Sequence, residues 1–116
     1  MCVGETREEN KNDQTRDILK KQLEVVKDIE LNNSLVIAYE PVWAIGTGLT
    51  PKMSEINEIS HFLTKILKNY SFKKIKILYG GSVNLSNIKE ILSLQKLDGV
   101  LVGSASTKPS FINYFK

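Results

Sequence analysis

Apolar residues along the chain form two alternating patterns, one with helical spacing and one nearly continuous. Apolar positions recur every three or four residues from Ile18 to Ile29, which predicts a helix, and the run Leu35–Tyr39 predicts a buried strand. The same order follows, with a helical stripe from Ile56 to Tyr70 and an apolar run at Ile75–Tyr79. Helix and strand therefore alternate along the chain.

A third cycle begins with a helical stripe from Leu85 to Leu92 and ends with the strand Gly99–Val102, and Pro109 suits the first position of a closing helix. Ser54 and Asn84 are expected to cap the starts of the second and third helices. Strands without polar alternation, each following a helix, are typical of a parallel sheet covered by helices. The sequence therefore predicts a single α/β domain without an internal linker.

With 116 residues, of which 41% are hydrophobic and 25% charged, the chain has the proportions of a globular domain. Its apolar runs are far shorter than the roughly 20 residues that cross a bilayer, and its N-terminus lacks the pattern of a signal peptide. We expect a soluble, cytoplasmic protein that does not bind membranes. The lone cysteine, Cys2, has no partner for a disulfide or a zinc site, so we interpret it as a structural thiol.

The formal net charge of +3 comes from lysines spread along the chain, with one cluster at Lys73, Lys74 and Lys76. A cluster of this kind before a strand is typical of a solvated turn, so we expect no binding to nucleic acid. The sequence contains no metal-binding motif.

Glu40 stands where the apolar strand closes and a loop opens. The loop is bracketed by Pro41 and by two glycines, Gly46 and Gly48, and its middle is apolar. A carboxylate in this position is placed like a general base beneath a mobile lid that excludes water. The alternatives are a strand-terminal glutamate in a salt bridge and a static surface loop with an exposed Trp43.

Glycine-rich turns follow two of the other predicted strands. Gly80-Gly81-Ser82 and Gly103-Ser104 each lie between a strand and a helix. Glycines allow the backbone to approach a ligand closely, and N–H groups that converge at such turns bind phosphate. The alternative is that both segments are only tight connections.

Four segments, in the same order along the chain, resemble the triosephosphate isomerase family: Cys2–Thr6, Ala38–Gly48, Tyr79–Val83 and Asp98–Ser106. The resemblance implies an α/β fold that is the C-terminal half of a TIM (β/α)8 barrel, with about three and a half βα units and parallel strands. Residues 1–116 would run from the end of strand five through helix eight of such a barrel. A complete barrel takes roughly 250 residues.

The resemblance also implies an activity. Glu40 would abstract the proton in the interconversion of dihydroxyacetone phosphate and glyceraldehyde 3-phosphate, in glycolysis and gluconeogenesis, without a metal or organic cofactor. Backbone amides of Gly46, Ser82, Gly103 and Ser104 would bind the substrate phosphate, although Ser104 stands where the family usually has a second glycine. The lid loop would consist of Pro41, Val42, Trp43, Ala44, Ile45, Gly46, Thr47 and Gly48.

Three further residues carry weaker expectations. Tyr79 either hydrogen-bonds the closed lid, as in the family, or only packs, and Glu5 either supports the rim of the site or forms a surface ion pair. His61, the only histidine, falls in the helix after the lid, which indicates a structural or surface role. The histidine and lysine that the family uses belong to earlier strands. We therefore expect the isolated chain to be inactive.

A half-barrel leaves strand edges unpaired on both sides. The partner expected there is a complementary N-terminal half-barrel or further copies of this chain, beside a small triose phosphate substrate. Met1 stands at a position where the family has an apolar strand residue, which suggests a longer ancestral reading frame. The alternative function is a non-catalytic relic, or a half-barrel that binds phosphate or a partner.

Overall fold

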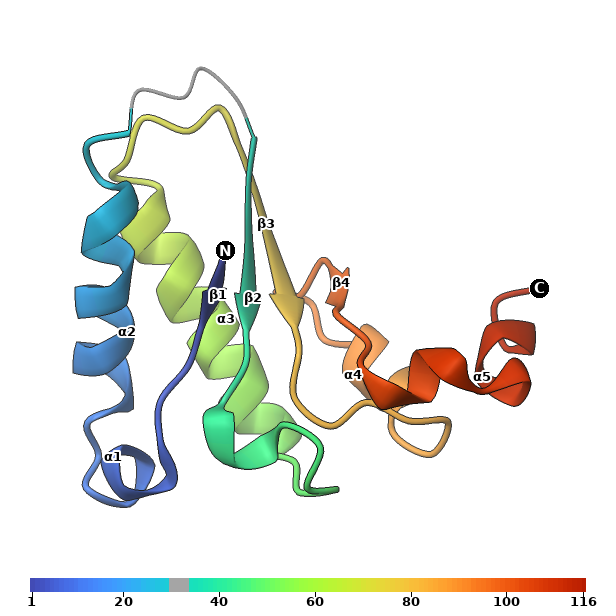
Figure 1. The fold of residues 1–116 in the computed structure, drawn as a ribbon. Coiled ribbons are helices and arrows are strands. Elements are labelled where there is room, and N and C mark those ends of the chain that lie inside the picture. The colour runs from blue at the N-terminus through green and yellow to red at the C-terminus, as the bar shows by residue number, and fades with distance from the viewer. Residues whose placement is uncertain (30–33) are drawn as a thin grey trace.

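The structure is a computed structural model that describes residues 1–29 and 34–116. Its strands form one parallel sheet in the order β1-β2-β3-β4, the order in which they occur along the chain (Figure 1). Their bounds are β1 (Cys2–Val3), β2 (Ser34–Tyr39), β3 (Lys74–Tyr79) and β4 (Gly99–Val100). The predicted parallel α/β arrangement is confirmed.

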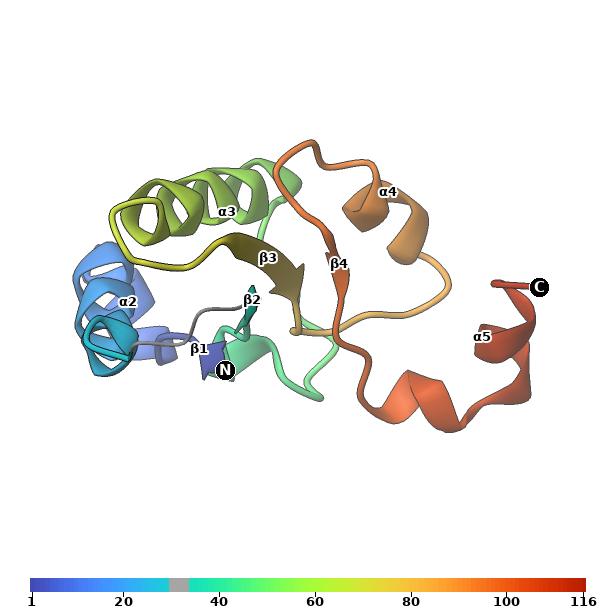
Figure 2. The same cartoon turned by 90° about the horizontal axis from the view of Figure 1, so that it is seen from above.

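The helices are separated from one another by these strands or by loops. They are α1 (Arg7–Lys11), α2 (Thr15–Leu23), α3 (Met53–Leu67), α4 (Ile88–Leu92) and α5 (Pro109–Asn113), with 3₁₀ turns η1 (Glu24–Val26), η2 (Val42–Ala44) and η3 (Ser104–Thr107). Helix α2 contacts β1, α3 contacts β3, and α4 contacts β4. All three helices lie along the outer side of the curved sheet (Figure 2). Within the described residues, no helix has the length and apolarity that crossing a membrane requires.

The core lies between the sheet and these helices. Every second residue of β2 and β3 points into this core, including Ile37 and Ile77. These side chains belong to the same buried cluster as leucines of α3 such as Leu63. The opposite face of β2 is more open, since Val36 is 44% exposed. The structure thus shows one face of the sheet covered by helices and the other more accessible.

The register of β2 and β3 places the site. Six consecutive residues pair, from Ser34 with Lys74 to Tyr39 with Tyr79, so both strands end at the same level of the sheet. β1 pairs with the end of β2 and passes it so closely that a side chain at Gly4 would place its Cβ 1.8 Å from the Glu40 carbonyl oxygen. The residues after these strands are thereby brought to one edge.

Some predicted element bounds are wrong. The helix predicted from Ile18 to Ile29 corresponds to α2, which ends at Leu23. The chain then tightens into η1 around the β-branched pair Val25-Val26, which leaves Ile29 outside any helix. β4 ends at Val100 instead of Val102, because the chain turns away after Leu101 donates its N–H to the Tyr79 carbonyl, 2.8 Å away.

The predicted cap at Ser54 is wrong, because Lys52 precedes α3 and Ser54 lies inside its first turn. Asn87 directly precedes α4, and Leu85 lies in the turn before it and is exposed. The Asn84 side chain nevertheless accepts the N–H groups of Ser86 and Asn87, and its carbonyl accepts that of Ile88, which is the hydrogen bonding expected of an N-cap. Helix α1 was not predicted, although its capping box, Thr6 with Glu9, is visible in the sequence.

Asp98 attaches β4 to β3. Its Oδ2 accepts the Ile77 N–H at 2.8 Å, and its Oδ1 accepts a hydrogen bond from Lys76 Nζ at 2.6 Å. Burial raises the pKa of Asp98, but the hydrogen bonds from Lys76 and Ile77 outweigh that effect and hold it below its ordinary value of 3.8. The carboxylate form is therefore the one that the fold favours.

We predict that Asp98→Asn lowers stability at pH 7 by about 0.5 to 1 kcal/mol, because asparagine keeps an acceptor for Ile77 but loses the charge that faces Lys76. Since the folded pKa is lowered, this stabilisation is present above pH 3.8 and disappears as the pH falls through the folded pKa. Urea unfolding at several pH values measures it. Asp28→Asn, at an exposed carboxylate, is the control, and a difference from wild type that persists unchanged at pH 2 would contradict the interpretation.

Candidate active site

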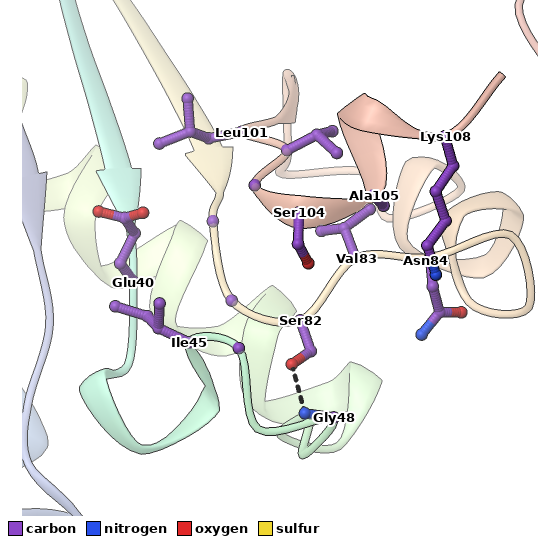
Figure 3. A pocket seen from close by; sticks show the side chains of 15 residues that line it. Glu40, Ile45, Gly48, Ser82, Val83, Asn84, Leu101, Ser104, Ala105 and Lys108 are labelled. Atoms are coloured by element: carbon purple, nitrogen blue, oxygen red, sulfur yellow. Dashed lines mark hydrogen bonds between the residues drawn. The ribbon is translucent and has the colours of Figure 1, made fainter. Parts of the chain in front are cut away.

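A cavity of about 530 Å3 lies at the carboxyl ends of β2, β3 and β4 (Figure 3). Its lining includes all five residues that the sequence suggested for catalysis and phosphate binding: Glu40, Gly46, Ser82, Gly103 and Ser104. They come from three separate loops, one after each strand. The cavity also contains Ile45 and Gly48 of the predicted lid, so base, lid and glycine turns converge on one hollow.

A backbone hydrogen bond holds Glu40 in place, and the absence of a side chain at Gly80 leaves room for the Glu40 carboxylate. Its N–H donates to the Val3 carbonyl at 2.8 Å, and a Cβ at Gly80 would lie 2.9 Å from Glu40 Oε1. Among the described residues, no lysine or arginine is within ion-pair distance of this half-buried carboxylate. The salt-bridge alternative for Glu40 therefore finds no partner in this part of the chain.

The Cys2 side chain lies beside Glu40. A hydrogen bond to the Glu40 carboxylate raises the pKa of the thiol, with smaller contributions from burial and from the negative charge. Cys2 is exposed in the structure, at the strand that borders β2. Its neutral thiol thus contacts the candidate base, a contact that its interpretation as a packing residue did not anticipate.

Four residues that line the cavity have backbone N–H groups without an acceptor among the described residues. Among the described hydrogen bonds, none is donated to a protein acceptor by the amides of Gly46, Ser82, Gly103 or Ser104. Gly46 has a φ of 68°, a left-handed conformation that favours glycine. The four amides that the sequence suggested for phosphate are therefore available in the folded chain.

Trp43 attaches the predicted lid to the N-terminal loop. Its Nε1 donates to Glu5 Oε1 at 3.0 Å, and the Arg7 guanidinium lies over the indole ring, 5.6 Å from the ring centroid. Val42 and Ile45 on the same segment are about half exposed, at 53% and 49%. The segment is thus fixed through its tryptophan while its aliphatic side chains face solvent.

Glu5 is completely buried, so the surface ion-pair interpretation is wrong. Besides Trp43, the Asn10 amide and the Tyr39 hydroxyl donate to its Oε1, at 3.1 and 3.2 Å. Burial and the nearby Glu5 charge raise the pKa of Tyr39, which stays a donor. Glu5 therefore joins α1, β2 and the predicted lid, while its Oε2 is buried without a hydrogen-bond partner among the described residues.

Tyr79 is fully buried at the end of β3. Burial raises the pKa of its hydroxyl to about 12, an effect that the neighbouring Thr50 side chain only partly opposes, and the hydroxyl makes no hydrogen bond of good geometry with a described group. A Cβ on Gly81 would lie 2.2 Å from that hydroxyl. In this structure Tyr79 packs beneath the turn and donates no hydrogen bond to the lid.

Ser82 connects the β3–α4 loop to the middle and to the C-terminal end of the predicted lid. Its Oγ donates to the Ala44 carbonyl at 2.6 Å and accepts the Gly48 N–H at 3.0 Å, the bond drawn in Figure 3. The Ser82 carbonyl accepts a hydrogen bond from the Asn87 side chain at 2.9 Å. One side chain thus holds the lid segment while the amide of the same residue stays free.

A family model described as triosephosphate isomerase matches residues 1–116. The chain belongs to the triosephosphate isomerase family. It is 49% identical to the triosephosphate isomerase of Rhizobium meliloti over 112 residues, which cover 93% of this chain and 44% of that protein. Identity to the enzymes of Dictyoglomus thermophilum and Candida albicans is 46% and 45%, with all of this chain aligned to 50% and 49% of theirs.

The chain spans about half the length of the curated relatives it matches. The four-stranded parallel sheet, with helices on its outer side, corresponds to part of a TIM barrel, as the sequence predicted. His61 is exposed on α3 and lines a hollow with Arg16 and Phe62, separate from the cavity that contains Glu40. Within residues 1–29 and 34–116, no cluster of acidic, histidine or cysteine side chains could hold a metal.

Sequence reasoning missed several residues around the site. Arg7, which covers Trp43, and Asn10, which donates to Glu5, lie in the helix that no apolar stripe predicted. Lys108 and Asn84 line the cavity, but neither belongs to the glycine turns. These four residues are recognised as neighbours of the site only from their positions in the folded structure.

We predict that Ser82→Ala loosens the lid segment, because both lid hydrogen bonds of the hydroxyl are lost. Each contributes about 1 kcal/mol, so local opening of η2 should become roughly 5- to 30-fold more frequent. Hydrogen exchange at the Ala44 amide, which donates to Pro41 and not to Ser82, measures the opening. Ser93→Ala, which removes a hydroxyl at the end of α4, is the control, and unchanged exchange at Ala44 would show that Ser82 does not restrain the lid.

Proposed function

We propose that this chain supplies the catalytic base and the phosphate-binding half of a triosephosphate isomerase site. The observation that supports the proposal is the cavity, whose lining includes both Glu40 and four residues whose amides donate no hydrogen bond to the described residues. The substrates are dihydroxyacetone phosphate and glyceraldehyde 3-phosphate. No metal or organic cofactor takes part, and the reaction belongs to cytoplasmic glycolysis and gluconeogenesis.

Isomerisation of this pair requires removal of a proton from a carbon next to a carbonyl. A carboxylate without a counter-ion, partly shielded from water, is suited to that step. Glu40 meets both conditions, and the gap left by Gly80 gives its side chain room next to the cavity. We assign proton abstraction to Glu40.

Binding the phosphate at the other side of the cavity fixes where the reacting carbon lies. The amides of Gly46, Ser82, Gly103 and Ser104 donate to the phosphate oxygens, and no charged side chain is needed for the contact. The amides of Ser82, Gly103 and Ser104 belong to turns that follow strands and orient the substrate, while that of Gly46 belongs to the lid and moves with it. Ser104 serves here through its backbone, so its side chain does not disqualify it.

The segment Pro41–Gly48 acts as the lid. The apolar side chains of Val42 and Ile45 are exposed to solvent in this structure. Their burial over a ligand would exclude water from the cavity. Excluding water strengthens the hydrogen bonds to the phosphate and protects the intermediate. The attachment of Trp43 to Glu5 and Arg7 then defines the position from which the lid moves.

The whole activity needs more than this chain provides. Among the described residues lining the cavity, none is a histidine or a second acid able to polarise the substrate carbonyl. We propose that residues 1–116 correspond to the segment from strand five through helix eight of the barrel, and that a complementary N-terminal half completes the site. The isolated chain is accordingly inactive as an isomerase.

A second candidate function is a half-barrel that binds phosphate without catalysis. The free amides favour it, because all of them belong to this chain and need no complementary half. The two candidates differ in their dependence on Glu40, since phosphate binding does not require the carboxylate and isomerisation does. Turnover and binding measured on the same variants separate them.

The test is a chimera in which residues 1–116 replace the matching segment of the Rhizobium meliloti enzyme. We expect it to interconvert the two triose phosphates, and we expect Glu40→Gln to lower kcat by about 1,000-fold, within the range of a lost general base. Glu58→Gln, at an exposed glutamate of α3, is the control. A folded chimera whose turnover survives Glu40→Gln would reject the assignment, and phosphate binding without turnover would favour the second candidate.

A further inference from the structure

The cavity has a second polar end, opposite Glu40. Asn84, Ala105 and Lys108 line both this cavity and an adjoining hollow of about 290 Å3 that extends to Phe111. In Figure 3 the Lys108 side chain extends toward Asn84 on the side of the pocket away from Glu40. The two hollows therefore adjoin at this end, and Lys108 stands at their junction.

Lys108 is the one cationic side chain among the residues that line the cavity in the described part of the chain. It is exposed, and it takes part in neither of the ion pairs among the described residues, which are Arg16 with Glu58 and Lys76 with Asp98. Its backbone is fixed on both sides, because its N–H donates to the Ala105 carbonyl at 3.1 Å and its carbonyl accepts the Phe111 N–H at 3.0 Å. An exposed charge is thus attached to a backbone position that hydrogen bonds hold in place at the edge of the cavity.

The proposed phosphate site lacks a full positive charge of its own. Backbone amides carry only partial charges, and the Glu40 carboxylate in the same cavity repels a phosphate dianion. A cation at the far end offsets that repulsion and draws the anion to the side of the cavity away from the base. In this arrangement the charge acts through space, and the amides make the contacts.

We propose that Lys108 attracts the phosphate group of the ligand and sets which end of the cavity it occupies. This inference rests on the proposed phosphate site at Gly46, Ser82, Gly103 and Ser104. The ligand class is a phosphate monoester or inorganic phosphate, and Lys108 is a positioning residue. An exposed charge acting on a dianion across solvent changes affinity by about three- to five-fold at low ionic strength, and salt screens the effect.

The experiment titrates inorganic phosphate into the isotope-labelled chain and follows the amides of Gly46, Ser82 and Gly103 by NMR. At an ionic strength of about 20 mM, where screening is weak, Lys108→Gln should bind about three- to five-fold more weakly than wild type. At about 300 mM the difference should fall below two-fold. Lys108→Arg, which keeps the charge, and Lys89→Gln, at an exposed lysine outside the cavity, should bind like wild type.

Each contrary result has a separate meaning. If Lys108→Gln binds like Lys89→Gln at low ionic strength, the role of Lys108 is rejected while the phosphate site stands. If Lys108→Arg is as weak as Lys108→Gln, or if the loss is equal at both ionic strengths, charge is not the cause and the inference is also rejected. If wild type shows no shifts at the three amides on adding phosphate, the proposed phosphate site fails and the role of Lys108 falls with it.

Discussion

The in-register pairing of β2 with β3 is the constraint on which the site depends. Because Tyr39 pairs with Tyr79, the next residues, Glu40 and Gly80, leave the sheet side by side. One of them carries the carboxylate and the other has no side chain to obstruct it. A shift of one residue would turn the side chains of one strand to the opposite face and remove this match. The chemistry of the cavity is thus set by backbone hydrogen bonds some distance from it.

Much of the fold follows from simple patterns, because parallel strands and their covering helices bury continuous or periodic apolar runs. Leu35–Tyr39 and Ile75–Tyr79 lie within the observed strands for this reason. Glu40 and the glycine turns were visible because they interrupt those runs at points where parallel strands end together. Sequence order and strand direction were sufficient to expect these residues in one place.

Other features depend on three-dimensional context. Glu5 has the charge of a surface residue, yet donors from three segments surround it, and only one of them, Asn10, is near it in sequence. Val36 belongs to an apolar run but faces the open side of the sheet. The contact between Cys2 and Glu40 and the location of Lys108 likewise arise from tertiary structure, which local patterns do not encode.

The two roles of Ser82 have a thermodynamic consequence. Its hydroxyl restrains the segment Pro41–Gly48, and its amide is free to bind an anion in the cavity. If seating an anion on that amide changes how firmly the hydroxyl holds the segment, linkage requires the reverse effect to be equally large. The position of the segment then alters anion affinity by the same factor. Binding and movement would share a single coupling free energy, located at one serine.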